Sequence, residues 1–128
     1  MSANSGSPEH GEQKADCLFC RIARGEIASR KVYEDDDIVA FHDINPAAPV
    51  HLLVVPRVHV ENLYDADLAH QALLGKMLGV AGRLAREQGA SDGFRLVINN
   101  GRVGRQEVYH LHAHILGGPS PLGSGFNR

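Results

Sequence analysis

Residues 110–116 alternate three histidines with apolar residues, in the order His110-Leu111-His112-Ala113-His114-Ile115-Leu116. A period of two is typical of a β-strand and not of a helix, because successive strand side chains point to opposite faces. The histidines would then project from one face, roughly 6.5–7 Å apart from one to the next, while the apolar residues enter a core. Such a strand predicts a surface for proton transfer, nucleophilic attack or metal binding.

The histidine pattern alone leaves three interpretations open. Two imidazoles at alternate positions can share a metal ion, but the third would lie ~13–14 Å from the first, too far to join the same ion. The second interpretation is nucleophilic catalysis at phosphorus by His112, because neutral imidazole is a good nucleophile and an acid–base group near pH 7. The third is a set of hydrogen-bonded histidines with no chemical role.

The remaining secondary structure is predicted from periodicity and from turn residues. A short helix is expected over residues 18–23, and further strands over 31–34, 38–41, 50–55 and 94–99. One long helix is expected from about Asp65 to Gln88, capped by Asp65 or Asp67 and ended by Gly89. Five strands in near succession with one long and one short helix predict an α+β domain with an antiparallel sheet.

Three glycines lie inside the expected long helix, at Gly75, Gly79 and Gly82. Each costs ~1 kcal/mol relative to alanine in a helix interior. They are either tolerated surface positions or mark the close approach of another element, including one across a dimer interface.

Composition argues against several functional classes. The 128 residues carry a formal net charge of −2, which argues against a non-specific nucleic-acid binder. No apolar run approaches the ~20 residues of a membrane span, and residues 1–15 contain no apolar stretch typical of a secretion signal. Those first residues are expected to be a disordered lead-in. We therefore expect a cytoplasmic protein without a membrane or nucleic-acid partner.

Two further segments carry chemistry. Cys17 and Cys20 form a C-x-x-C motif, for which metal binding, redox chemistry and ordinary packing remain open. A zinc site would need two more ligands. The loop at 99–107 combines glycines, amides and arginines, which suit it as the wall of a phosphate pocket.

The histidine motif with its apolar spacers resembles the signature of the histidine triad (HIT) superfamily. Further segments look like the Hint branch, the bacterial-type histidine triad nucleotide-binding proteins or purine nucleoside phosphoramidases: 17–22, 25–27, 32–35, 40–46, 48–51, 55–59 and 106–110. The likeness defines a HIT domain over about residues 16–118, followed by a tail at 119–128.

The resemblance implies a homodimer in which one sheet continues across both protomers. It also implies binding of purine nucleotides such as AMP or GMP, and hydrolysis of purine nucleoside 5′-phosphoramidates through a nucleotidyl-histidine intermediate. The alternatives are a dinucleoside polyphosphate hydrolase, a deadenylating enzyme, or a nucleotide- or zinc-binding regulatory module with incidental catalysis.

Residue roles follow from the resemblance. His112 would be the nucleophile, oriented by the carbonyl of His110, while His114 would contact the phosphate or the leaving group and His51 would support the triad. The residues implied in nucleotide binding are Phe19, Ile22, Phe41, His42, Asp43, Ile44, Leu53, Asn99, Glu107, Val108, His112 and His114. Catalysis would need no cofactor. Several relatives hold a structural zinc ion, and the matching ligands would be Cys17, Cys20, His51 and His110; otherwise the two cysteines are reduced and packed near the first helix.

Two positions depart from the family pattern. Arg105 stands where the family usually has glycine, so either the backbone accommodates a side chain there or Arg105 adds a phosphate contact. Glu107 stands where eukaryotic relatives have serine, so a serine-type role in leaving-group departure does not carry over.

Overall fold

The computed structural model describes residues 16–124. The expected lead-in at 1–15 and the last four residues of the expected tail lie outside the described residues. In chain order the elements are α2 (Leu18–Ala23), β1 (Lys31–Glu34), β2 (Ile38–His42), β3 (Val50–Pro56), the 3₁₀ helix η1 (Leu68–His70), α3 (Gln71–Gly79), α4 (Ala81–Glu87), β4 (Phe94–Val97) and β5 (Ala113–Gly117).

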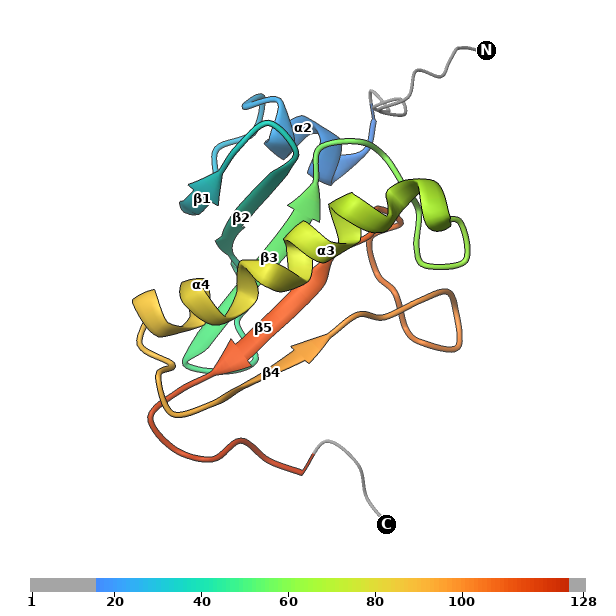
Figure 1. Ribbon diagram of the computed structural model, residues 1–128. Helices are drawn as coiled ribbons and strands as arrows, with labels where there is room; N and C mark the ends of the chain where they lie inside the picture. The colour runs from blue at the N-terminus through green and yellow to red at the C-terminus, as the bar shows by residue number, and fades with distance from the viewer. Residues whose placement is uncertain (1–15, 125–128) are drawn as a thin grey trace, which may run out of the picture.

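The five strands form one antiparallel sheet in the order β1-β2-β3-β5-β4 (Figure 1). This confirms the α+β class and the antiparallel five-stranded sheet. The central strand β3 is buried over its whole length, in keeping with its almost continuous apolar sequence. β1 and β4 are the edge strands. Over residues 16–124, no helix is both long and apolar enough to cross a membrane.

The two faces of the sheet bury different groups. On one face α3 packs against β3, and α4 packs against β3, β4 and β5 (Figure 1). Leu111, Ala113 and Ile115 join this larger core, as their alternation with the histidines predicts. On the other face, Phe41 of β2 and Leu53 of β3 belong to a smaller cluster with residues of α2. The candidate site lies on this second face.

The long helix has an interruption that the sequence does not predict. Asp67 caps its 3₁₀ turn, accepting a hydrogen bond from the Ala69 N–H at 2.9 Å, and α3 and α4 are separated at Val80. The Val80 N–H still donates to the Lys76 carbonyl at 3.1 Å, so the helical hydrogen bonding bridges the break. Gly89 ends the helix with a φ of 102°, a conformation that glycine adopts without strain.

The regular strand β5 begins three residues later than expected, so the expected strand over 110–116 is wrong at its start. Val54 pairs with Ala113, and the same register would bring Leu111 opposite Pro56, which has no N–H to donate. The Leu111 N–H donates instead to the Val60 carbonyl at 2.7 Å. His110 and His112 therefore precede the regular strand, and only His114 lies within it.

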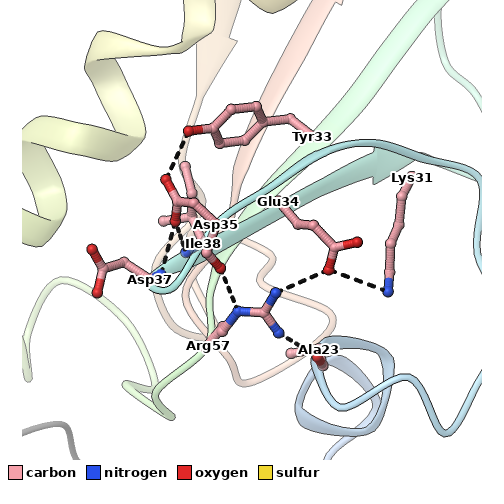
Figure 2. Close-up of polar contacts among 8 residues, drawn as sticks. All are labelled: Ala23, Lys31, Tyr33, Glu34, Asp35, Asp37, Ile38 and Arg57. Carbon is pink, nitrogen blue, oxygen red and sulfur yellow. Dashed lines mark hydrogen bonds and ion pairs between the residues drawn. The ribbon is translucent and has the colours of Figure 1, made fainter.

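Arg57, which directly follows β3, ties α2 to the turn between β1 and β2 (Figure 2). Its guanidinium donates to the Asp35 carbonyl at 2.7 Å, to the Ala23 carbonyl at the end of α2, and to the Glu34 carboxylate at 2.9 Å. Asp35 Oδ1 closes the turn by accepting from two backbone N–H groups. These contacts hold α2 beside the sheet, where it forms one wall of the candidate site.

Candidate active site

A cavity of about 480 Å³ opens on the α2 face of the sheet, within the size range of small-molecule sites. Every residue expected to contact a nucleotide lines it: Phe19, Ile22, Phe41, His42, Asp43, Ile44, Leu53, Asn99, Glu107, Val108, His112 and His114. His51 and Arg105 line it as well. The lining residues that the sequence did not single out are Leu18, Ile27, Ala28, Ser29, Asn45 and Ala47.

One part of the cavity is apolar. Phe19, Ile22, Phe41 and Leu53 are at most 6% exposed and form its floor. The Phe19 and Phe41 rings pack edge to face with centroids 5.7 Å apart. Aromatic and branched side chains in this arrangement suit the faces of a planar ring.

A chain of imidazoles forms the polar part. The rings of His112 and His114 lie 4.9 Å apart. His114 Nδ1 is 2.9 Å from Nε2 of His51, and the same Nε2 is 3.4 Å from a carboxylate oxygen of Asp43. A phosphoryl group in the cavity would therefore meet two imidazoles, with a third imidazole and a carboxylate behind them.

The hydrogen bonds assign the ring protons. Nδ1 of His51 accepts from the Ala47 N–H at 2.9 Å, so neutral His51 carries its proton on Nε2 and donates it to His114 Nδ1. Neutral His114 then carries its proton on Nε2. Nδ1 of His112 donates to the His110 carbonyl at 2.7 Å, which leaves the Nε2 lone pair of His112 available as a nucleophile.

Burial keeps these imidazoles neutral. Desolvation lowers the pKa of His112 against the opposing effect of the His110 carbonyl and two carboxylates. Desolvation, together with the neighbouring imidazoles His112 and His51, lowers the pKa of His114 to about 4. The pKa of His51 is also lowered by burial, with Asp43 acting in the opposite direction. At neutral pH the nucleophilic form of His112 is therefore the populated one.

His110 lies outside the cavity, so the expectation that all three triad histidines face one surface is wrong. The Phe19 ring packs edge to face against the rings of His110 and His112. Its centroid lies 5.9 Å from that of His110 and 5.1 Å from that of His112. Nε2 of His110 donates to the Pro56 carbonyl at 2.7 Å. Its Nδ1 lies 3.3 Å from the sulfur of Cys17 and 3.5 Å from that of Cys20.

Four residues gather into a candidate metal site, Cys17, Cys20, His59 and His110, with their ligand atoms all within 4.8 Å of one another. The fourth contact is from Cys20 sulfur to His59 Nδ1, at 3.4 Å. Sulfur and nitrogen ligands of a tetrahedral zinc ion lie about 3.5 Å apart, so the donor atoms fit zinc. Cys17 begins α2 as its N-cap, which places both sulfurs on the same side.

The prediction that His51 is a ligand of the cysteine metal site is wrong. Its two ring nitrogens contact Ala47 and His114 in the lining of the cavity, and His59 takes its place in the cysteine cluster. No spacing rule identifies His59, because it follows β3 by three residues in an irregular segment. It belongs to the segment 55–59 that resembles the Hint branch, but a single histidine outside a motif carries little signal.

The loop at 99–107, before the histidines, is stabilised by hydrogen bonds of its own Gln106 side chain. Gln106 is 7% exposed, and its side-chain oxygen accepts from the Gly101 N–H at 2.9 Å and from Asn62 at 3.1 Å. Arg105 has a φ of 63°, which costs about 1–2 kcal/mol for a residue other than glycine. Its side chain lines the cavity. The backbone thus does accommodate a side chain at this position, in the left-handed conformation.

Comparison with known proteins identifies the family of this chain. The HIT domain family matches residues 24–120, so the chain belongs to the HIT family. It is 52% identical to protein HitA of Neisseria gonorrhoeae over 81% of this chain and 97% of that one. It is 46% identical to the purine nucleoside phosphoramidase of Escherichia coli K12, over 84% and 91%.

Two further similarities bear on fold and metal. A histidine triad protein from Clostridium difficile superposes with a TM-score of 0.81 at 46% identity, covering 87% of this chain and 97% of that one. The 14 kDa zinc-binding protein of Brassica juncea is 45% identical, over 80% of this chain and 93% of that one.

Proposed function

We propose that the chain hydrolyses purine nucleoside 5′-phosphoramidates, such as adenosine monophosphate linked to an amine. The observation that carries the proposal is the free Nε2 of His112, presented to the cavity by the bond from Nδ1 to the His110 carbonyl. The 46% identity to a purine nucleoside phosphoramidase supports the reaction class.

The proposed reaction has two displacements at phosphorus. His112 Nε2 attacks, the new P–N bond forms, and the bond to the leaving amine breaks with its electron pair on that nitrogen. Neutral His114 donates its Nε2–H to a phosphoryl oxygen in both steps, and a water molecule gives a proton to the amine nitrogen as the bond to phosphorus breaks. The hydroxide formed from that water attacks the nucleotidyl-histidine, and His112 leaves as neutral imidazole.

The other lining residues hold the nucleotide. The apolar floor packs against the purine faces, and the Asp43 carboxylate accepts hydrogen bonds from the ribose hydroxyls. Asp43 Oδ1 also accepts from the Asn45 N–H at 2.8 Å, which orients the carboxylate. Asn99 and the segment at Glu107 and Val108 hold the phosphate, with Arg105 supplying a cation there.

The test is turnover of an adenosine 5′-phosphoramidate, followed by AMP release. The proposal expects turnover by the parent protein and none by His112→Ala, with AMP bound by both. Diadenosine polyphosphate is the comparison substrate, and faster turnover of it would favour a polyphosphate hydrolase instead. AMP binding without turnover of either substrate would leave a nucleotide-binding module.

We also propose that Cys17, Cys20, His59 and His110 hold a structural zinc ion, which would tie α2 to the segment after β3. Their geometry and the zinc-binding relative support this. Metal analysis of protein prepared without chelator should find zinc in the parent and in His51→Ala, and little in His59→Ala. Equal zinc in all three would contradict the ligand set.

Thiolate ligands persist in reducing compartments, which supports a cytoplasmic location.

The homodimer is a third proposal. β4 is an edge strand, and one of its sides lacks a strand partner within residues 16–124. An edge strand presents unpaired N–H and C=O groups, with which a strand of a second protomer can pair. The solution mass should be twice the 13.9 kDa of the chain, as measured by light scattering, and a monomer at micromolar concentration would contradict the proposal.

A further inference from the structure

We propose that Cys17 and Cys20 are a modification site, at which a peroxide forms an intramolecular disulfide that weakens nucleotide binding. The chain holds two cysteines, and no disulfide joins them in this structure. Their sulfur atoms lie within 4.8 Å of each other. Both sulfurs contact Nδ1 of His110, at 3.3 Å and 3.5 Å. The effect on binding rests on the proposed function, whereas formation of the disulfide does not.

The position of the two cysteines suits a disulfide. Cys17 is the N-cap of α2 and Cys20 lies in its first turn, and the C-x-x-C spacing is that of thiol–disulfide oxidoreductases. Cys17 is partly exposed, whereas Cys20 is fully buried. Redox-sensitive sites pair an accessible sulfur with a second, resolving cysteine in this way. We therefore expect a peroxide to reach Cys17 first.

The reaction consumes one molecule of hydrogen peroxide and transfers two electrons to it. The Cys17 sulfur attacks one peroxide oxygen, the O–O bond breaks, and the thiol proton leaves with the other oxygen as water. The Cys20 sulfur then attacks the sulfur of the Cys17 sulfenic acid. The S–O bond breaks, and the Cys20 thiol proton leaves with the hydroxyl group as a second water. Both sulfurs are oxidised, and both peroxide oxygens are reduced.

The surroundings stabilise the reduced pair more than the disulfide. The Cys20 sulfur lies 3.4 Å from Nδ1 of His59, and the Cys17 sulfur is 3.4 Å from the Cys20 N–H. A thiol can donate to an imidazole nitrogen, whereas a disulfide has no proton to donate. A disulfide whose reduced form is stabilised is readily reduced. Small thiols should therefore reverse the modification.

Phe19 connects the cysteines to the cavity. It lies between them in the sequence, and its ring packs 5.9 Å from the ring of His110 and 5.1 Å from that of His112. It also lines the cavity floor. When the sulfurs join, they withdraw from His110 Nδ1, and a close-packed interior transmits such a shift to its neighbours. Disulfide formation should therefore displace Phe19 and disturb the position of His112.

The experiment treats the protein with a small excess of hydrogen peroxide, both as purified and after metal removal by a chelator. Tryptic peptide 15–21, which contains both cysteines, should become lighter by two hydrogen atoms and resist alkylation. AMP binding should weaken about 3- to 10-fold, the range of one displaced aromatic contact. Dithiothreitol should restore both the thiols and the affinity. Any zinc bound at the site should be released as the disulfide forms.

The control is Cys17→Ser, which cannot form the disulfide. Peroxide should leave its AMP affinity equal to that of its own untreated sample, which also controls for oxidation of methionine. A second measurement needs no nucleotide. The ring-proton NMR signal of His112 should shift on oxidation of the parent, because the Phe19 ring lies beside it, and should not shift in the control.

The modification is overturned if neither preparation forms the linked peptide, or if peroxide yields sulfinic acid or a disulfide-linked dimer instead. A disulfide that leaves AMP affinity unchanged overturns the effect on binding. Failure of the reduced parent to bind AMP would instead contradict the proposed function. In that case an unchanged His112 signal is the result that overturns the coupling between the cysteines and the cavity.

Discussion

The hydrogen bond from His112 Nδ1 to the His110 carbonyl, at 2.7 Å, is the contact on which the proposed chemistry depends. A carbonyl oxygen can only accept, so the bond fixes the tautomer and the plane of the ring together. His110 thus serves His112 through its backbone, while its side chain contacts the cysteines. His110 thus contributes to both sites, which share Phe19 as a neighbour.

The lowered pKa of His114 predicts a loss of stability in mild acid. The unfolded chain binds a proton at this residue below its ordinary pKa of 6.5, whereas the folded protein does so only near pH 4. Between these values the unfolded state holds more protons, so the free energy of unfolding falls as the pH falls. One histidine contributes up to about 2 kcal/mol between pH 6.5 and 5, and partial exposure of His114 reduces this.

Urea unfolding at pH 7 and pH 5 measures the effect. The parent should lose stability over this interval, and His114→Gln, which cannot titrate, should lose less. An equal loss in both proteins would show that His114 titrates normally. The pKa of His110 is also lowered to about 4, so His110 contributes to the pH dependence of both proteins. The two proteins are therefore compared at the same metal content.

Arg105 predicts opposite effects on binding and stability. Arg105→Gly removes a cation from the cavity wall and should weaken AMP binding about tenfold, since a hydrogen bond to a charged group contributes roughly 1.5 kcal/mol. Glycine also relieves about 1–2 kcal/mol of left-handed strain, offset by about 0.5–1 kcal/mol of added unfolded-state entropy. The melting temperature should therefore not fall. Unchanged affinity in calorimetry would contradict the phosphate contact.

At the scale of elements, the loop between β4 and β5 is shaped by one close backbone approach. A Cβ at Gly104 would lie 2.5 Å from the Asn100 carbonyl oxygen and 2.8 Å from the Asn100 nitrogen. Backbone atoms cannot yield as a side chain can, so Gly104→Ala must move the loop. Since Asn99 and Arg105 line the cavity on either side, the movement reaches the phosphate end.

Gly104→Ala should therefore lower stability by about 1–3 kcal/mol and raise KM for the phosphoramidate. The control is Gly75→Ala in α3, where nothing lies within 4 Å of an added Cβ. That variant should gain about 0.5–1 kcal/mol through helix propensity and keep its activity. Equal melting temperatures for the two variants would contradict the account of the loop. A loss of dimer in Gly75→Ala would instead place that glycine at a protomer contact.

The sequence predicts most elements because local signals and tertiary packing agree. The apolar run of β3, the alternation of Leu111, Ala113 and Ile115, and the glycine after α4 each carry their own physical reason. The prediction fails where a distant partner decides. Pro56 lies more than fifty residues before His110, yet it stops the pairing that would have extended β5.

The same limit applies to the candidate site. The cavity-lining residues were predicted from the resemblance to the histidine triad family, because they lie in the segments that match that family. The exchange of His51 for His59 in the metal cluster was not predicted, because His51 lies near the start of β3 and His59 just after its end, and only the fold shows which of them reaches the cysteines.

At the scale of the molecule, the two faces of the sheet have different roles: one buries the larger core and the other carries the cavity. α3 and α4 cover one face of the sheet (Figure 1) and bury the larger core there. Residues of α2 and of the loop before β5 line the cavity on the other face. Arg57 and the candidate metal site both tie α2 in place, through the Ala23 carbonyl and through the two cysteines. The cavity therefore depends on contacts at both ends of α2.

The most direct test of the central claim is the site of the covalent intermediate. The protein is mixed with an adenosine 5′-phosphoramidate, quenched in alkaline denaturant within the first turnover, and digested for mass spectrometry. The account predicts one adenylyl group on His112, and none on the His112→Ala protein, which should not turn over. An adduct on His51, His110 or His114, or turnover by His112→Ala at the parent rate, would contradict it.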